Sequence, residues 1–289
     1  MSNIPVIAFG SSPDVYYIGL GMRYYMAGMP ESVRPTIQKL PAIQLQWMSI
    51  EEDGSWATRE GYGCRTEFST SVTQGAIDKI KAFPAADYVT FGPTKSIFCA
   101  ITPGQGWAGS MADEQIEKLR EMQASVGGED VFNQGLKGIL FGKGMTMIFM
   151  FKGGFSYYTD SEAEGGKMES LLNEYIYRQP AWTLERGSTL CPWNVDYYFL
   201  KFKDPESSTI KMFWSLPQSM ADNLADLQAT LATPEAQQAI ANHEQLGLVL
   251  ATSNYVQYTN GWPVYFTQNL SIAAANALRV STGAYVYRW

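Results

Sequence analysis

Six aromatic residues recur along the chain, each near a glycine-containing or polar turn. They are Tyr25, Trp56, Trp107, Tyr157, Trp214 and Trp262. Tyr and Trp combine a large apolar ring with a polar edge, so they can pack between units or stack on a sugar or a planar ligand. Arg23, Arg65 and Lys211 fall on neighbouring predicted strands and can supply the polar contacts that a mostly apolar site needs. These nine residues are the candidate ligand-binding set.

Residue types that carry catalysis give weaker patterns. Glu51, Glu52 and Asp53 form an acidic turn, and paired carboxylates can act as acid and base on glycosides, although a solvated hairpin tip is the simpler interpretation. The chain has one histidine, His243, and no G-x-S-x-G motif to pair with it in a catalytic triad. A histidine-rich metal site is excluded by the same count. The sequence predicts no cofactor and no metal, and it identifies no catalytic residue.

The segment 104–109, GQGWAG, matches the G-x-G-x-x-G pattern of dinucleotide-binding loops and lies between a predicted strand and a predicted helix. Trp107 is too bulky for a turn that holds a pyrophosphate, and no parallel strand begins soon after the helix. A hairpin turn that uses glycine is therefore the preferred interpretation of this segment.

Composition limits the class of protein and its partners. With 46% hydrophobic and 17% charged residues, the chain can build a globular core. The net charge of −7 and the absence of a Lys/Arg cluster predict neither a nucleic acid nor an anionic membrane as partner. No signal peptide or membrane span is evident, and Cys64, Cys99 and Cys191 are widely spaced. These features predict the cytoplasm, with unpaired thiols.

Strand, turn and helix signals repeat with a period of about 48 residues. Each unit offers about three strands and one outer helix, and polar linkers are expected at 123–135 and 180–192. Gly10, Gly92 and Gly142 mark matched turns, with Trp47, Trp193 and Ala251 at roughly corresponding places elsewhere. The approximate units are 4–40, 41–81, 86–122, 138–178, 193–231 and 246–280, followed by a closing strand at 283–289.

Units of 40 to 50 residues with several strands each are typical of propeller-like rings. A last strand without a helix fits a segment that closes such a ring and removes an open sheet edge. The predicted fold is a mainly β single repeat domain over residues 1–289, a six-unit β-propeller-like toroid with peripheral helices. The alternative is an ordinary α+β domain in which Phe-Gly dipeptides recur without a structural repeat.

Two phrases carry a resemblance to a known family. Residues 91–98 and 104–119, FGPTKSIF and GQGWAGSMADEQIEKL, and residues 9–18 and 23–33, FGSSPDVYYI and RYYMAGMPESV, resemble a tandem repeat of fungal proteins of unassigned function. The resemblance is good in units one and three, partial in four and five, and poor in two and six. The chain is more distantly similar to six-bladed fungal lectins, which lack the helices expected here.

These patterns predict a binding protein for a small molecule or carbohydrate, lectin-like, that uses aromatic-lined sites. One alternative is an enzyme of secondary metabolism, of cyclase or lyase type, with an aromatic-lined cavity. Another is a platform for protein interactions. The three differ in whether the aromatic residues converge on one cavity or repeat around a rim.

Overall fold

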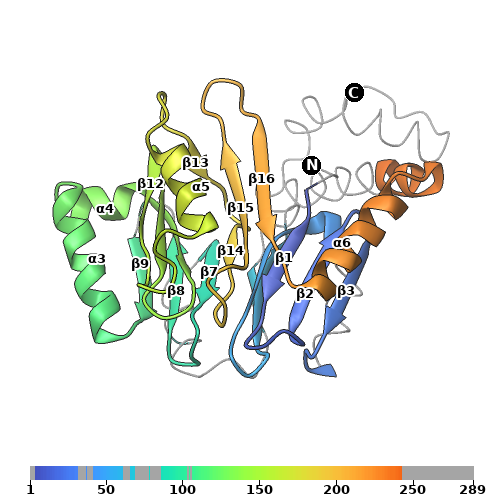
Figure 1. Ribbon diagram of the computed structural model, residues 1–289, viewed down its shortest axis with the longest axis horizontal. Helices are drawn as coiled ribbons and strands as arrows, with labels where there is room; N and C mark the ends of the chain where they lie inside the picture. The colour runs from blue at the N-terminus through green and yellow to red at the C-terminus, as the bar shows by residue number, and fades with distance from the viewer. Residues whose placement is uncertain are drawn as a thin grey trace, which may run out of the picture.

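The computed structural model describes residues 4–31, 37, 42–60, 66–68, 78, 86–102, 104 and 106–242. Within these ranges the protein is mainly β, with small antiparallel sheets and a few helices between them (Figure 1). The predicted sixth unit, 246–280, and the closing strand, 283–289, lie outside the described residues, as do Arg65, His243 and Trp262.

Four sheets share one plan, in which three strands follow one another in the chain and pair antiparallel with their sequence neighbours. Antiparallel neighbours need only a short hairpin turn between them. Sheet I contains β1 (Val6–Phe9), β2 (Tyr16–Leu20) and β3 (Arg23–Ala27), and sheet II contains β4 (Leu45–Ile50), β5 (Trp56–Glu60) and β6 (Thr66–Phe68). Sheet III contains β7 (Tyr88–Phe91), β8 (Phe98–Thr102) and β9 (Gly106–Ser110), and sheet IV contains β10 (Leu136–Phe141), β11 (Met147–Phe151) and β12 (Gly154–Tyr158).

Sheet V differs because its first strand is in two pieces. Both β13 (Thr183–Leu184) and β14 (Thr189–Leu190) pair with the same edge of β15 (Tyr198–Lys203), whose other edge pairs with β16 (Ile210–Ser215). Residues 185–188 between the two pieces form a bulge opposite Lys201. The stretch 180–192, expected as a linker, thus supplies the first strand of unit five, ahead of its predicted start at 193.

Each first strand ends in a hairpin turn that is closed by an equivalent backbone hydrogen bond. The N–H of Gly10 donates to the carbonyl of Val15, and that of Gly92 to Ile97. A Cβ on Gly10 or Gly92 would lie 2.4 or 2.3 Å from the β-branched side chain of that partner, so close approach requires glycine at both positions. The equivalent pairs are Gly10–Val15, Glu51–Ser55, Gly92–Ile97, Gly142–Thr146 and Cys191–Tyr197.

Glu51 and Cys191, rather than the expected Trp47 and Trp193, therefore correspond to the glycines of the other units. The partner of Glu51 is the small residue Ser55, which leaves room for a side chain at position 51. The repeat is more regular in its hydrogen bonds than in its residue types.

Helices follow sheets III, IV and V: α3 (Asp113–Ser125), α4 (Glu129–Gly135), α5 (Lys167–Ile176) and α6 (Gln218–Leu231). Figure 1 shows α3 and α4 on the side of β9, and α6 beside β2 and β3. The buried residues of α5, Met168, Leu172 and Tyr175, recur at helical spacing and form one apolar stripe. The stretch 123–135, expected as a linker, contains α4, whose buried Phe132 anchors it to the sheets.

Each helix covers the junction between its own sheet and the next one. Phe132 of α4 makes edge-to-face contacts with Phe149 and Phe151 of sheet IV. Tyr175 of α5 stacks on Phe202 of sheet V, with ring centroids 4.3 Å apart. Leu224 of α6 belongs to a cluster of buried residues drawn from sheets I and V. Unit five is thereby joined to unit one.

The five first strands contact one another in cyclic order: β1 with β4, β4 with β7, β7 with β10, β10 with β14, and β14 with β1. Each sheet itself remains open, and no sheet closes into a barrel in the described part of the chain. Sheets I and V are direct neighbours, with no other described sheet between them. The six-unit ring predicted from the sequence is not confirmed.

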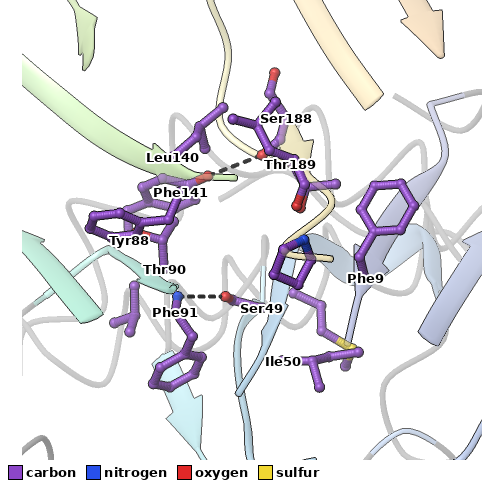
Figure 2. A pocket seen from close by; sticks show the side chains of 14 residues that line it. Phe9, Ser49, Ile50, Tyr88, Thr90, Phe91, Leu140, Phe141, Ser188 and Thr189 are labelled. Atoms are coloured by element: carbon purple, nitrogen blue, oxygen red, sulfur yellow. Dashed lines mark hydrogen bonds between the residues drawn. The ribbon is translucent and has the colours of Figure 1, made fainter. Parts of the chain in front are cut away.

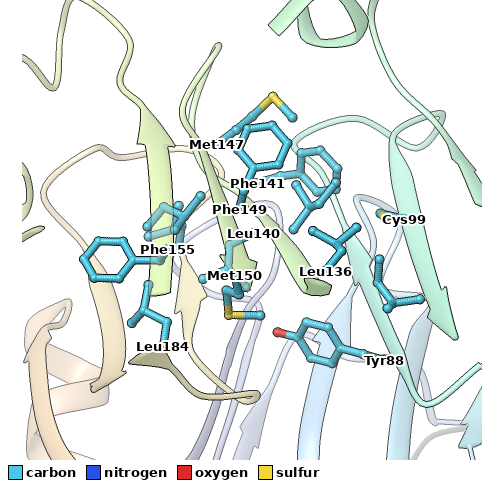
Figure 3. Close-up of a cluster of buried hydrophobic side chains, with 14 of the residues drawn as sticks. Tyr88, Cys99, Leu136, Leu140, Phe141, Met147, Phe149, Met150, Phe155 and Leu184 are labelled. Carbon is cyan, nitrogen blue, oxygen red and sulfur yellow. The ribbon is translucent and has the colours of Figure 1, made fainter. Parts of the chain in front are cut away.

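The largest core cluster joins sheets III, IV and V with part of sheet II. Figure 3 shows Tyr88, Leu140, Met150 and Phe155, from four different strands, gathered in this cluster. Burying a side chain such as Leu140 or Phe155 contributes about 1.5–3 kcal/mol, so the junctions between sheets hold the units together.

Candidate functional site

A groove of about 340 Å³ lies at the junction of sheets I and V. Its lining comes from β16 of sheet V, from the end of β2 and from the C-terminal end of α6. The groove is lined by Pro5, Leu20, Met212, Trp214, Gln228, Leu231, Ala232 and Gln237. We call this feature the junction groove; its volume lies at the lower end of the range for ligand pockets.

Trp214 is the dominant side chain of the junction groove. It is 42% exposed, unusual for a residue of this size, while its β15 partner Phe199 is fully buried. The two rings are tilted by 42° with centroids 6.4 Å apart, so Phe199 supports Trp214 from the core side. Met212 lies two residues away on the same strand face and extends the apolar wall. The indole therefore presents a supported apolar surface to the groove.

Two amide side chains supply polarity to the junction groove. The Nε2 of Gln237 donates to the carbonyl of Leu231 at 2.6 Å, which fixes the amide and leaves its oxygen as an acceptor. The side chain of Gln228 forms no hydrogen bond with another described residue, so both its donor and its acceptor groups can meet a ligand. The groove lining contains no charged side chain among the described residues.

The structure brings Arg23 and Tyr25 to the same junction as Trp214. Arg23 pairs across the sheet with Leu20, which lines the groove, and Tyr25 lies two residues further along the same face. The Tyr25 hydroxyl donates to Asp226 Oδ2 of α6 at 2.6 Å, and this hydrogen bond raises the pKa of the phenol. Of the nine predicted ligand-binding residues, Trp214 thus lines the groove, and Arg23 and Tyr25 lie at the same junction.

Other members of that set lie at different junctions. Trp107 on β9 is half-buried against the large core cluster. Tyr157 on β12 donates its hydroxyl to Asn173 of α5. Lys211 lies on the face of β16 opposite to Trp214, with its Nζ 5.1 Å from the centre of the Trp182 ring. These aromatic residues are distributed over the outer strands and do not converge on one cavity.

Trp56 differs from the other predicted aromatics. It begins the middle strand of sheet II and is only 3% exposed, because it pairs with Ile50 and packs between sheets I and II. Its role in the described structure is core packing. Arg65 and Trp262 cannot be compared in this way, since both lie outside the described residues.

The acidic turn at 51–53 places its three carboxylates in different environments. Asp53 forms an ion pair with Lys95, and Glu52 accepts a hydrogen bond from the backbone N–H of Lys95. Glu51 is fully buried and neither carboxylate oxygen has a hydrogen-bond partner. Burial, and secondarily the negative charge of Asp53, raises the Glu51 pKa to about 7. Gly104 lies in a turn just ahead of β9, which begins at Gly106, in agreement with the hairpin interpretation, and both glycines have positive φ.

The centre of the five first strands is nearly filled. A cavity of about 20 Å³, enough for a single water molecule, is lined by residues from all five strands. Figure 2 shows Phe9, Ser49, Thr90 and Thr189 around it, each from a different strand. Thr90 Oγ1 donates to the carbonyl of Ile139, and the N–H of Phe91 donates to Ser49 Oγ. We call this feature the axial cavity; it has no room for a substrate.

Bulge 185–188 crosses the N-terminal end of these strands. The Tyr88 hydroxyl of β7 donates to the carbonyl of Ser188 at 3.3 Å (Figure 2). Gly187 has a φ of +80°, and a Cβ there would lie 2.9 Å from the carbonyl oxygen of Gln46 in β4. The bulge is not predicted from the sequence, since only the Gly-Ser pair at 187–188 indicates a turn.

Five charged side chains meet at the bulge: Asp87, Lys137, Glu185, Arg186 and Lys201, here called the axial charge cluster. Arg186 pairs with Asp87, and its Nε donates to the carbonyl of Lys137. Lys137 pairs with Glu185 at 2.8 Å. Lys201 is 6% exposed, and burial lowers its pKa to about 8, partly offset by the charge of Glu185. The burial of Lys201 could not be predicted from the sequence, because a single lysine in an apolar strand matches an ordinary solvent-facing position.

None of the described helices is long and apolar enough to cross a membrane. In the same residues, no group of three or more His, Cys, Asp or Glu side chains is arranged to hold a metal ion. No protein-family model matches this sequence, and comparisons with curated proteins and with solved structures find no similar one.

Proposed function

We propose that this protein binds a neutral, hydroxyl-rich small molecule, such as a sugar, in the junction groove. Trp214 would stack on the apolar face of the ligand, while Gln228 and Gln237 would pair with its hydroxyl groups. The exposed, supported indole of Trp214 in a groove of about 340 Å³ is the observation that carries this proposal.

The chemistry of the groove favours a neutral ligand. Its described lining is apolar with two amides, a combination that suits hydroxyl groups, which both donate and accept hydrogen bonds. Arg23 and Asp226 stand near the groove but not in its lining, so they can orient a ligand at its edge without binding a charge inside it.

We also propose that the five described sheets are the blades of a propeller-like ring. The cyclic contacts of the first strands support this architecture, as do the helices that cover successive junctions. In such a ring, a groove between two blades is a natural binding site, and the nearly filled axis leaves the rim as the available surface. The alternatives of an enzyme with one deep aromatic cavity and of an interaction platform have no comparable support.

The test begins with a glycan array on the full-length protein, followed by titration calorimetry with the best ligand. We expect Trp214→Ala to weaken binding roughly 5- to 30-fold, since an aromatic stacking contact contributes about 1–2 kcal/mol. Tyr177→Ala is the matched control, because Tyr177 is 80% exposed and lies outside the groove. A flat array, or equal loss of affinity in both variants, would contradict the proposal.

A further inference from the structure

The axial charge cluster is unbalanced, with three cations and two carboxylates. The two carboxylates each have a cationic partner, in the pairs Asp87–Arg186 and Lys137–Glu185. Lys201 is the third cation, and its Nζ forms no hydrogen bond with any described residue. A largely buried cation without a hydrogen-bond partner is energetically unfavourable, the charge of Glu185 offsets this only in part, and a bound anion would compensate it further.

The surroundings of Lys201 are polar and confined. A Cβ on Gly187 would lie 2.5 Å from Lys201 Nζ, so the ammonium occupies the space that a side chain at 187 would fill. The backbone N–H of Lys201 donates to Ser188 Oγ, which ties β15 to the bulge. The ammonium is thus held beneath the bulge, near the ends of the first strands.

A second unpartnered group belongs to the same cluster. Asp87 is 9% exposed, and its Oδ1 is buried without a hydrogen-bond partner, while Oδ2 is paired with Arg186. A buried acceptor left in this way calls for a donor from water or from a ligand. The cluster therefore contains a donor, Lys201 Nζ, and an acceptor, Asp87 Oδ1, that have no hydrogen-bond partner among the described residues.

The outer edge of the cluster is open to solvent. The side chains of Arg186 and Lys137 are 23% and 21% exposed, so a small solute can enter the cluster from this side. Both cations can help to bind an anion that approaches from this side, since charge-assisted hydrogen bonds to oxyanions are stronger than hydrogen bonds between neutral groups.

We propose that the axial charge cluster binds a small oxyanion, of the phosphate or carboxylate class, held chiefly by Lys201. Protonated phosphate suits the cluster best, because it has acceptor oxygens for the ammonium and an O–H donor for a group such as Asp87 Oδ1. This site lies at the end of the first strands and is independent of the junction groove and of any ligand bound there.

The experiment is thermal unfolding and titration calorimetry of the full-length protein with inorganic phosphate, with malonate, and with chloride at matched ionic strength. At roughly 100 times the dissociation constant, we expect phosphate to raise Tm by about 5 °C. Malonate tests whether a carboxylate can occupy the same site. A smaller rise in Tm than with phosphate supports a site selective for phosphate, and an equal rise supports a site that binds both oxyanions. If neither phosphate nor malonate raises Tm more than chloride does, the proposal is overturned, and no variant is needed to decide it.

Two variants locate the effect. Lys201→Met removes the ammonium but keeps the length of the side chain, and we expect it to abolish the anion-dependent shift. Lys95→Met is the matched control, because Lys95 lies on an exposed turn, where its partner is Asp53. An undiminished shift in Lys201→Met would assign the anion to another site and overturn the proposal.

Discussion

The junction groove and the axial charge cluster use their side chains in opposite ways. In the groove, the large residue Trp214 is exposed and the described lining is uncharged. In the cluster, five charged residues are wholly or partly buried, and ion pairs and a hydrogen bond connect the bulge to β10 and to the start of β7. Exposed apolar surface costs the fold little and is available for a ligand, whereas buried charge affects the stability of the fold directly. Substitutions in the two regions should therefore affect different measurements.

The largest effect on stability is expected from Arg186→Leu. The change leaves Asp87 largely buried without its cation, and we expect the free energy of unfolding to fall by about 2–4 kcal/mol. Urea unfolding followed by circular dichroism measures the loss. The double variant Asp87→Asn/Arg186→Leu should recover part of it, and a double variant no more stable than Arg186→Leu would contradict this explanation.

Lys201→Met should change how stability depends on pH. Because the pKa of Lys201 is about 8 in the folded protein and about 10.4 in the unfolded chain, the unfolded state binds more protons between these values. The wild-type protein should therefore gain stability as pH rises from about 8 to 10.4, by up to about 3 kcal/mol. Relative to wild type, the variant should be most stabilised below pH 8 and progressively less above it. Parallel stability curves for the two proteins would show that Lys201 is not buried as a cation.

Trp214→Ala should cause a large change in ligand affinity and a small change in stability, in contrast to the substitutions in the axial charge cluster. The side chain is 42% exposed, so we expect a loss of about 1 kcal/mol or less on unfolding. Chemical unfolding in the absence of ligand provides the measurement. A loss as large as that of Arg186→Leu would mean that Trp214 is mainly a core residue, and the contrast between the regions would fail.

The smallest effect is expected from Glu51→Gln, at the opposite end of the first strands. The pKa of Glu51 is about 7 in the folded protein, above its ordinary value of about 4.3, so the folded state binds more protons between these values. Stability should fall as pH rises from about 4.3 to 7, and Glu51→Gln should remove that fall. The full pKa difference corresponds to about 3.7 kcal/mol, but solvent screening at this exposed turn should reduce the effect to about 1 kcal/mol. A pH profile for the variant identical to that of wild type would show that Glu51 is solvated.

Much of the fold was predictable because it depends on local patterns. Strands ending in glycine turns, and the helices near residues 113, 167 and 220, follow from apolar periodicity and turn chemistry. The steric need for Gly10 and Gly92 makes those turns visible in the sequence. The arrangement of the sheets around one another depends on contacts between distant strands, which no local pattern specifies.

The two candidate sites were predictable to different degrees. Arg23, Tyr25 and Trp214 were named from residue type and position, although the sequence could not indicate that these three share one junction. The axial charge cluster was missed, because Asp87, Glu185 and Lys201 are far apart in the chain and only the bulge brings them together. Burial of a single lysine also leaves no pattern in its neighbours.

The most direct test of the central claim follows the indole N–H signals of the eight tryptophans by NMR during titration with the best ligand from the array. Trp214→Phe assigns the Trp214 signal. If the ligand binds in the junction groove, this signal shifts in proportion to ligand occupancy, while those of the buried Trp47 and Trp56 remain in place. An unchanged Trp214 signal, with a shift at another tryptophan, would place the ligand elsewhere and contradict the account.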